Sequence, residues 1–230
     1  MTQRTRIHNL HVSLDGYAAG TFITREKPFG DALELMAGFD GRFIHGMSDV
    51  DAPLTLERAM TTLWSQGIGA EIMGRGKFTP ETGPWTDEGW RGWWGEEPPF
   101  STPVFVMTHH PRESMEFANG TVFHFVSGPP AEVLDQAKGA AGGLDVRIGG
   151  GPTSVRSFLA DDLVDVMHTV TVPVVLGEGT PLWDGLGGLQ RRFSIEAVGS
   201  SDGVVHHLWN RWPRGVENAS GEATPRTGGT

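Results

Sequence analysis

Three consecutive glycines at 149–151 are the feature of this sequence best suited to binding chemistry. They follow a short apolar run at 146–148, and apolar residues with the spacing of one helix face come after them. Pro152 suits the first position of a helix, where no N–H is needed. The stretch 145–159 therefore predicts a strand, a glycine turn and the start of a helix.

This strand, turn and helix has two interpretations. Glycines lack Cβ, so a phosphate can approach the backbone, and the N–H groups of a helix N-terminus attract anions. The alternative is a tight turn with no ligand. The stretch is not a Rossmann fingerprint, because Ser154 stands where its third glycine would be and no acidic residue follows about 20 positions later. Nor is it a P-loop, because no Gly-Lys-Ser/Thr follows.

Two acidic residues that follow predicted strands are candidates for contact with a substrate. Asp15 would face the same edge of a sheet as Gly74 and Gly149. Its carboxyl group could act in catalysis by orienting a water that relays a proton, or it could bind the polar edge of a heterocycle. The alternative is that Asp15 belongs to an ordinary Asp-Gly turn. Glu178 ends a later predicted strand and is a second candidate for the substrate site.

The segment 79–102 predicts a long loop, because it is rich in Pro, Gly, Trp and acidic residues and has no periodicity. Its tryptophans argue against disorder, since disordered segments are poor in aromatic residues. We expect one of Trp90, Trp93 and Trp94 to cover the mouth of the site, with Trp94 against the substrate. The flanking acidic residues predict a neutral or weakly charged substrate. The alternative is that the loop only packs on the surface.

The composition narrows the class of protein. With 18 Lys and Arg against 28 Asp and Glu, the net charge of the 230 residues is −10, which argues against nucleic acid and anionic membranes as partners. There is no Cys, so disulfides and thiolate chemistry are excluded. The histidines show no metal-ligand spacing, and we expect no metal. Without a membrane-length apolar run or a signal peptide, a cytoplasmic protein is expected.

The elements that must position these residues alternate between strands and helices. They predict an α/β fold with a mostly parallel central sheet, flanking helices and a C-terminal antiparallel hairpin. Residues 1–212 are expected to form one domain, and 213–230, with almost no apolar residue, a disordered tail. Helices are expected to start near residues 51, 129 and 152. The predicted strands are 7–14, 69–73, 104–107, 121–126, 145–148, 165–176, 193–198 and 204–209.

Five stretches, in order along the chain, resemble the dihydrofolate-reductase-like fold family. The resemblance is closer to the reductase domain of the riboflavin-biosynthesis deaminase–reductase and its stand-alone bacterial relatives. The five lie within residues 7–210. They are VSLDGYAAG at 12–20, GAEIMGR at 69–75, PVFVMTHHPRE at 103–113, VRIGGGPTSVRSFL at 146–159 and LVDVMHTVTVPVVLGEGTPLW at 163–183.

The resemblance implies an NADPH-dependent reductase that transfers a hydride to a small heterocyclic or carbonyl substrate. For cofactor binding, the resemblance implies residues at predicted strand ends: Gly74 and Arg75 on the phosphates, Thr108 and His109 by the ribose 2′-phosphate, and Gly149, Gly150, Gly151 and Thr153 on the pyrophosphate. The guanidinium group of an arginine at such a place can form paired hydrogen bonds with phosphate.

The sequence departs from the family in places that concern function. Lys77 stands where many relatives carry Thr beside the cofactor, and Val166 where relatives often have Glu. The insertion at 20–50 is unlike the riboflavin-pathway reductase, so the substrate of that enzyme is not assigned to this chain. Two alternatives therefore stay open, a true dihydrofolate reductase and a non-catalytic nucleotide-binding module of the same fold.

Assembly is a further expectation from the resemblance. Relatives with this fold often pair through the sheet edge near the C-terminal strands. We therefore expect a homodimer, with apolar surface supplied by Val204, Leu208, Trp209 and Trp212.

Overall fold

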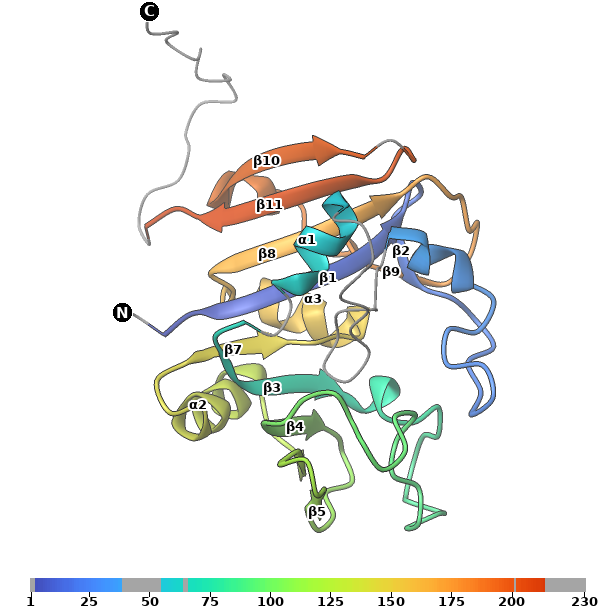
Figure 1. Cartoon of the computed structure of the whole chain (residues 1–230), viewed down its shortest axis with the longest axis vertical. Coiled ribbons are helices and arrows are strands. Elements are labelled where there is room, and N and C mark those ends of the chain that lie inside the picture. The colour runs from blue at the N-terminus through green and yellow to red at the C-terminus, as the bar shows by residue number, and fades with distance from the viewer. Residues whose placement is uncertain (1–2, 39–54, 64–65, 201, 214–230) are drawn as a thin grey trace, which may run out of the picture.

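The computed structural model describes residues 3–38, 55–63, 66–200 and 202–213. Within these residues, nine strands form one central sheet. Figure 1 shows the sheet with its strands in the order β10-β11-β8-β1-β7-β3-β4-β6-β5 from top to bottom. The strands are β1 (Thr5–Ser13), β3 (Ile68–Gly74), β4 (Pro103–Met107), β5 (Met115–Glu116), β6 (Val122–Val126), β7 (Asp145–Ile148), β8 (Val166–Val172), β10 (Phe193–Gly199) and β11 (Val205–Arg211).

The sheet is parallel through its middle and antiparallel at both edges. β1 pairs in parallel with β7 and β8, β3 with β7 and β4, and β4 with β6. β11 runs antiparallel to β8 and β10, and β5 runs antiparallel to β6. The expected α/β fold, with a mostly parallel sheet and a C-terminal antiparallel hairpin, is confirmed.

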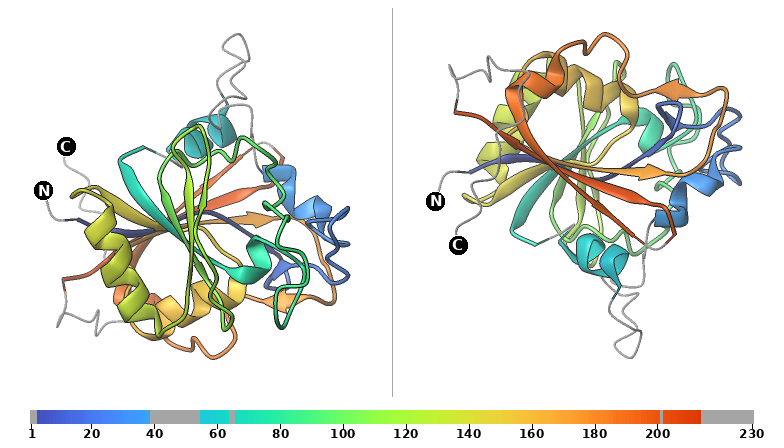
Figure 2. Two further views of the ribbon diagram at one scale, coloured as in Figure 1. Left: turned by 90° about the horizontal axis from the view of Figure 1, so that it is seen from below. Right: turned by 90° about the horizontal axis from the view of Figure 1, so that it is seen from above.

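Helices cover both faces of the sheet. Figure 2 shows α2 (Pro130–Ala140) and α3 (Pro152–Ala160) on one face and α1 (Leu56–Thr62) on the other. Both α2 and α3 begin with a proline, where its missing N–H costs no hydrogen bond. Their apolar sides join the strands in the main hydrophobic core. Short 3-10 helices are η1 (Leu33–Gly38), η3 (Arg75–Lys77) and η4 (Leu189–Arg192).

The loop at 79–102 forms no helix or strand, as predicted, and three of its tryptophans, Trp85, Trp90 and Trp94, pack against the second core cluster. Trp94 stacks on Phe123 of β6 with ring centroids 5.9 Å apart. Trp90 donates a hydrogen bond from Nε1 to the carbonyl oxygen of Phe78, at 2.9 Å. Aromatic pairs of this kind contribute about 0.5–1.5 kcal/mol each beyond area burial. A second core cluster is thus built from Phe78, Phe100, Phe117, Phe123 and Phe125 with Trp85, Trp90 and Trp94 at its margin.

One strand prediction is wrong at its carboxyl end. The strand β8 ends at Val172, and residues 173–179 form an irregular loop, since Pro173 lacks the N–H that a strand ladder needs. After this loop, β9 (Thr180–Pro181) pairs antiparallel with β2 (Tyr17–Ala19). This two-stranded sheet ties the segment after β1 to the segment after β8.

The C-terminal strands offer less apolar surface than expected. Val204 is 2% exposed and belongs to a small core cluster with β8. Trp209 stacks on Trp183 with ring centroids 5.7 Å apart, and its Nε1 donates to Thr169 Oγ1 at 3.1 Å. Val204 is therefore a core residue, and Trp209 is partly buried against the main core. The sequence pattern could not show this, because the partners of Trp209 lie on other elements.

Some sequence predictions lie outside the described residues. They concern the helix start at 51–54 and the tail from 214 to 230. The helix α1 begins at Leu56, where the Thr55 side chain accepts a hydrogen bond from the Arg58 amide at 3.1 Å. The expected domain of residues 1–212 stays a prediction.

Candidate active site

The carboxyl ends of the parallel strands meet at one edge of the sheet, on the right of Figure 1. Ligands of open α/β sheets bind outside this edge. Because β3 and β7 are neighbours there, the end of β3 lies against the glycine turn, which we define as residues 149–151. The Gly74 amide donates to the carbonyl oxygen of Gly150 at 2.8 Å, and the Gly149 amide donates to that of Ile72 at 2.8 Å. The structure thus brings Gly74 and the glycine turn together.

Steric space explains why these positions are glycines. A Cβ on Gly74 would lie 2.1 Å from Ser154 Oγ, and one on Gly149 would lie 2.0 Å from Glu71 Oε1. Gly150 has a φ of +108°, which L side chains rarely adopt, and its peptide bond to Gly151 is cis. A Cβ on Gly151, in contrast, would meet nothing within 4 Å. The turn is therefore closely packed on one side and open at Gly151, as a phosphate cradle requires.

The helix α3 begins directly at the glycine turn. Gly151 is its N-cap residue and has no side chain to satisfy the first amides. The first N–H groups of an α-helix have no partner within the helix, so those of Thr153 and Ser154 are donors that an anion can use. Thr153 is exposed. The backbone at this point suits the pyrophosphate that the sequence predicts.

A group of charged side chains lies next to the glycine turn. Glu71 of β3 and Arg147 of β7 are each 1% exposed and form an ion pair between neighbouring strands. The Lys77 Nζ lies 3.5 Å from Glu71 Oε1 and donates to the Gly149 carbonyl oxygen at 2.6 Å. Sequence analysis did not assign Glu71 and Arg147 to the site, although both lie in stretches that carry the family resemblance, because nothing in the local sequence shows that their side chains meet across β3 and β7.

Arg75 lies on η3, directly after β3, and its guanidinium group contacts the loop at 79–102. Its Cζ lies 3.9 Å from the Trp85 ring centroid, and its Nη1 donates to the Gly83 carbonyl oxygen. Arg112 lies over the same indole at 4.2 Å. Burial lowers the pKa of both guanidinium groups. We call Arg75 and Arg112 the arginine pair; sequence analysis did not find Arg112.

Thr108 and His109 follow β4, beside the arginine pair. Thr108 is 7% exposed, and its Oγ1 accepts a hydrogen bond from the His110 amide at 3.1 Å. The Trp85 Nε1 donates to the carbonyl oxygen of His110 at 2.6 Å, which joins this strand end to the indole under the arginines. His109 is exposed. The predicted cofactor residues therefore form two groups, one at the glycine turn and one around Trp85.

Comparison with known proteins identifies the family. A family model described as the RibD C-terminal domain matches residues 4–205. The chain belongs to the RibD C-terminal domain family. This confirms the resemblance found in the sequence, and the family is one of oxidoreductases. No match is found among the curated proteins.

Solved structures share the fold of this RibD C-terminal domain. A Shewanella sp. PV-4 protein assigned to riboflavin biosynthesis is 20% identical, with a TM-score of 0.54 and coverage of 92% of this chain and 100% of that one. The Thermotoga maritima diaminohydroxyphosphoribosylaminopyrimidine deaminase/5-amino-6-(5-phosphoribosylamino)uracil reductase is 14% identical, with a TM-score of 0.54 and coverage of 92% and 57%. Acinetobacter baumannii RibD is 16% identical, with a TM-score of 0.50 and coverage of 92% and 58%. The chain thus spans just over half of the latter two.

Asp15, the predicted catalytic residue, holds two loops of this RibD C-terminal domain together. Its Oδ1 accepts hydrogen bonds from Ser13 Oγ at 2.6 Å and from the Leu176 amide at 3.2 Å. Its Oδ2 accepts one from the Gly177 amide at 2.7 Å. The Ser13 bond, followed by the backbone amides, lowers the pKa of Asp15. An ionised carboxylate engaged in this way is suited to positioning the loop at 173–179 and not to donating a proton.

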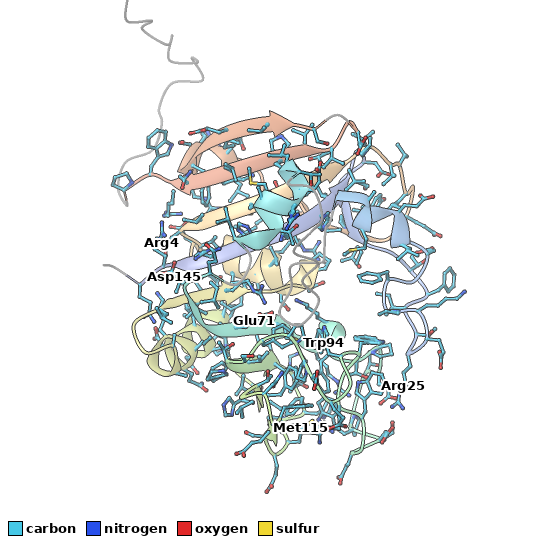
Figure 3. All side chains as sticks on the ribbon, in the orientation of Figure 1. Arg4, Arg25, Glu71, Trp94, Met115 and Asp145 are labelled. Atoms are coloured by element: carbon cyan, nitrogen blue, oxygen red, sulfur yellow. The ribbon has the colours of Figure 1, made fainter. Side chains whose placement is uncertain are left out.

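The two other predicted substrate residues lie in different places. Glu178 is exposed in the loop that Asp15 holds, so these two acidic residues share one region. Trp94 belongs to the aromatic cluster, and its ring lies 4.9 Å from that of Phe100. The Phe100 ring is in turn 6.0 Å from Lys77 Nζ, so Trp94 is linked to the glycine turn through Phe100 and Lys77. In Figure 3, the labelled side chains of Trp94 and Arg25 both lie in the lower right part of the molecule. Contact with a substrate stays a prediction for both residues.

The structure also bears on metal binding and on membrane insertion. Within the described parts of the chain, no group of three His, Asp or Glu side chains could hold a metal ion. No helix among those same residues has the length and apolar character to cross a lipid bilayer. The expectation of a metal-free protein stays a prediction.

Proposed function

We propose that the chain is an NADPH-dependent reductase that transfers a hydride to a small heterocyclic or carbonyl substrate. The observation that carries this proposal is the glycine turn. It is tied to β3 by the Gly74–Gly150 hydrogen bond and open at Gly151, in a member of an oxidoreductase family. Bound NADPH would supply the hydride. The amides at the start of α3, with Thr153, would hold its pyrophosphate.

The second group of residues would hold the ribose 2′-phosphate. Thr108 and His109 are the residues expected there, and we add Arg75 and Arg112, because both lie over the indole of Trp85 beside this strand end. Guanidinium groups pair well with phosphate oxygens, because their N–H groups form a planar fork. The positive charge of the two arginines would favour NADPH over NADH, because only NADPH carries the 2′-phosphate.

The substrate would lie between the loops held by Asp15 and the edge of the aromatic cluster. Asp15 fixes the loop that carries Glu178, and Trp94 would offer a flat apolar wall. The T. maritima protein is described as a reductase of an aminouracil carrying a phosphoribosylamino group, which supports ribosylamino-pyrimidines as the first class to test. The cytoplasmic location and the homodimer expected from the sequence belong to this proposal.

NADPH oxidation in the presence of a panel of ribosylamino-pyrimidines and pterins tests the proposal. Turnover of a pyrimidine but not of dihydrofolate supports it. Turnover of dihydrofolate instead would favour a dihydrofolate reductase. Tight binding of NADPH without turnover of any compound would favour a non-catalytic module, and failure to bind NADPH would overturn the proposal.

A further inference from the structure

We propose that Lys77 binds the pyrophosphate of the dinucleotide directly, as the cation of the glycine turn. The inference rests on the proposed function, since the ligand is its cofactor, and it goes further by assigning to the pyrophosphate a residue that the sequence analysis did not assign.

The position of Lys77 is the first argument. It is the last residue of η3, which follows β3 at the site edge of the sheet. Its Nζ donates to the Gly149 carbonyl oxygen at 2.6 Å, and its Cδ is the nearest atom to a Cβ built on Gly150, at 3.8 Å. The side chain therefore runs along the glycine turn. It is 28% exposed, so a ligand at the turn can reach it.

The balance of charge is the second argument. Among the described residues, the carboxylate beside Lys77 is that of Glu71 on β3. Glu71 also pairs with the buried Arg147 of β7 through Oε2, while Lys77 lies at the longer distance of 3.5 Å from Oε1. Lys77 therefore shares this carboxylate with a second cation. Pyrophosphate oxygens at the glycine turn would give its ammonium group a closer anionic partner.

The geometry of Lys77 itself is the third argument. An ammonium group has three N–H donors. One is used by the Gly149 carbonyl oxygen, and Glu71 takes a second only at 3.5 Å. Arg75, the neighbouring cation on η3, is held against Trp85. Lys77 is thus the cation of η3 whose charged group contacts the glycine turn.

Binding of an anion should change the protonation of Lys77. Burial lowers the pKa of its ammonium group to about 8. A phosphate within hydrogen-bond distance favours the charged form and raises that pKa. If Lys77 only supported the Gly149 carbonyl, a ligand out of its reach would leave the pKa where it is.

The test is a pH titration of the lysine side chains by NMR. The sequence has only three lysines, Lys27, Lys77 and Lys138, so carbon-13 labelling of lysine gives three side-chain signals. The Lys77→Arg variant identifies the signal of Lys77. We expect saturating NADPH to raise its titration midpoint by about one pH unit or more, as an opposite charge does. The signal of Lys138, on α2, is the internal control and should not move.

Affinity measurements at two pH values complete the test. The wild type should bind NADPH up to about tenfold more weakly at pH 9 than at pH 7, because the protonated fraction of Lys77 falls. Lys77→Met should bind weakly and Lys77→Arg tightly, both without this dependence on pH, while Lys138→Met behaves as wild type. Circular dichroism checks the fold of each variant.

The outcomes separate this inference from the proposed function. If NADPH binds, but the Lys77 midpoint does not move and Lys77→Met keeps the pH dependence, the inference is overturned and the proposed function stands. If NADPH does not bind, the proposed function is overturned. ADP-ribose, which carries a pyrophosphate without nicotinamide, is then titrated in the same way. A raised Lys77 midpoint would support the inferred contact between Lys77 and the pyrophosphate, and an unchanged midpoint would overturn it.

Discussion

The guanidinium of Arg75 stacks on the indole of Trp85, with its Cζ 3.9 Å from the ring centroid, and Arg112 lies over the same indole. Two N–H-bearing nitrogens of each arginine are buried without a hydrogen-bond partner among the described residues. Of the nearby carboxylates, Glu81 and Asp87 are paired with Arg25, while the charge of Glu88 acts on Arg112. Unpaired buried donors cost about 1–3 kcal/mol each, so an anion here would be stabilising.

We therefore predict that Arg112 contributes to the choice between NADPH and NADH. Arg112→Met should weaken NADPH binding by about tenfold, the effect of one charge-assisted hydrogen bond, and leave NADH binding nearly unchanged. Arg75→Met should act in the same direction. Equilibrium titration with both coenzymes measures the effect. The matched control is Arg91→Met, because Arg91 also lies over an aromatic ring, that of Phe117 at 4.2 Å. Equal losses for the two coenzymes would contradict this role.

The arginine pair illustrates what the sequence could and could not predict. The longer strands and the helices α2 and α3 follow from apolar periodicity, whereas the short strands β2, β5 and β9 were not predicted. The glycine turn follows from three glycines before Pro152. Arg112 lies within a stretch that carries the family resemblance, but its place beside Arg75 depends on the end of β4 and the long loop both packing around Trp85. Asp15 was correctly placed at a strand end, but the amides that hold its carboxylate come from a loop predicted as a strand. Contacts between distant segments carry no local signal.

A chain of buried histidines crosses β8 and β11. The Asn9 amide donates to His168 Nδ1 at 3.4 Å, so His168 Nε2 carries the proton and donates to His206 Nδ1 at 3.0 Å. His8 lies against His168, with ring centroids 4.7 Å apart. Burial, followed by the neighbouring histidines, lowers the pKa of His168 to about 2, and burial lowers that of His8 to about 4. Protonation of His168 would break the bond from Asn9.

This histidine chain predicts loss of stability in acid. The folded pKa values lie below the ordinary value of 6.5, so the unfolded chain binds protons first as the pH falls. The contribution of these two histidines to the free energy of unfolding is fully present above pH 6.5. It is lost progressively toward pH 4, by up to about 1.4 kcal/mol per pH unit for each histidine. His168→Gln should reduce that slope, measured by urea unfolding at several pH values. His109→Gln, at an exposed position, is the control, and a slope unchanged in His168→Gln would refute this account.

The outer edge of the sheet is the expected dimer surface. The edge strand β10 exposes Ile195 by 39% and Val198 by 40%, whereas Val204 is buried. Exposed edge strands readily pair with another chain. We predict a homodimer by light scattering at micromolar concentration, and dissociation to monomers in Ile195→Lys. A monomeric mass for the wild type would show that this edge stays unpaired.

The most direct test of the central claim is the NADPH affinity of the Gly151→Val variant. Gly151 has a φ of −73°, which valine tolerates, and a Cβ there meets nothing within 4 Å, so the fold should persist. The side chain would instead occupy the open side of the glycine turn. Gly139→Ala, on α2 with the same free space around its Cβ, is the matched control. Our account predicts that Gly151→Val keeps its thermal stability and loses NADPH affinity by about tenfold or more, a change of at least about 1.4 kcal/mol. Wild-type affinity in a folded Gly151→Val protein would contradict the assignment of the glycine turn as the cofactor site.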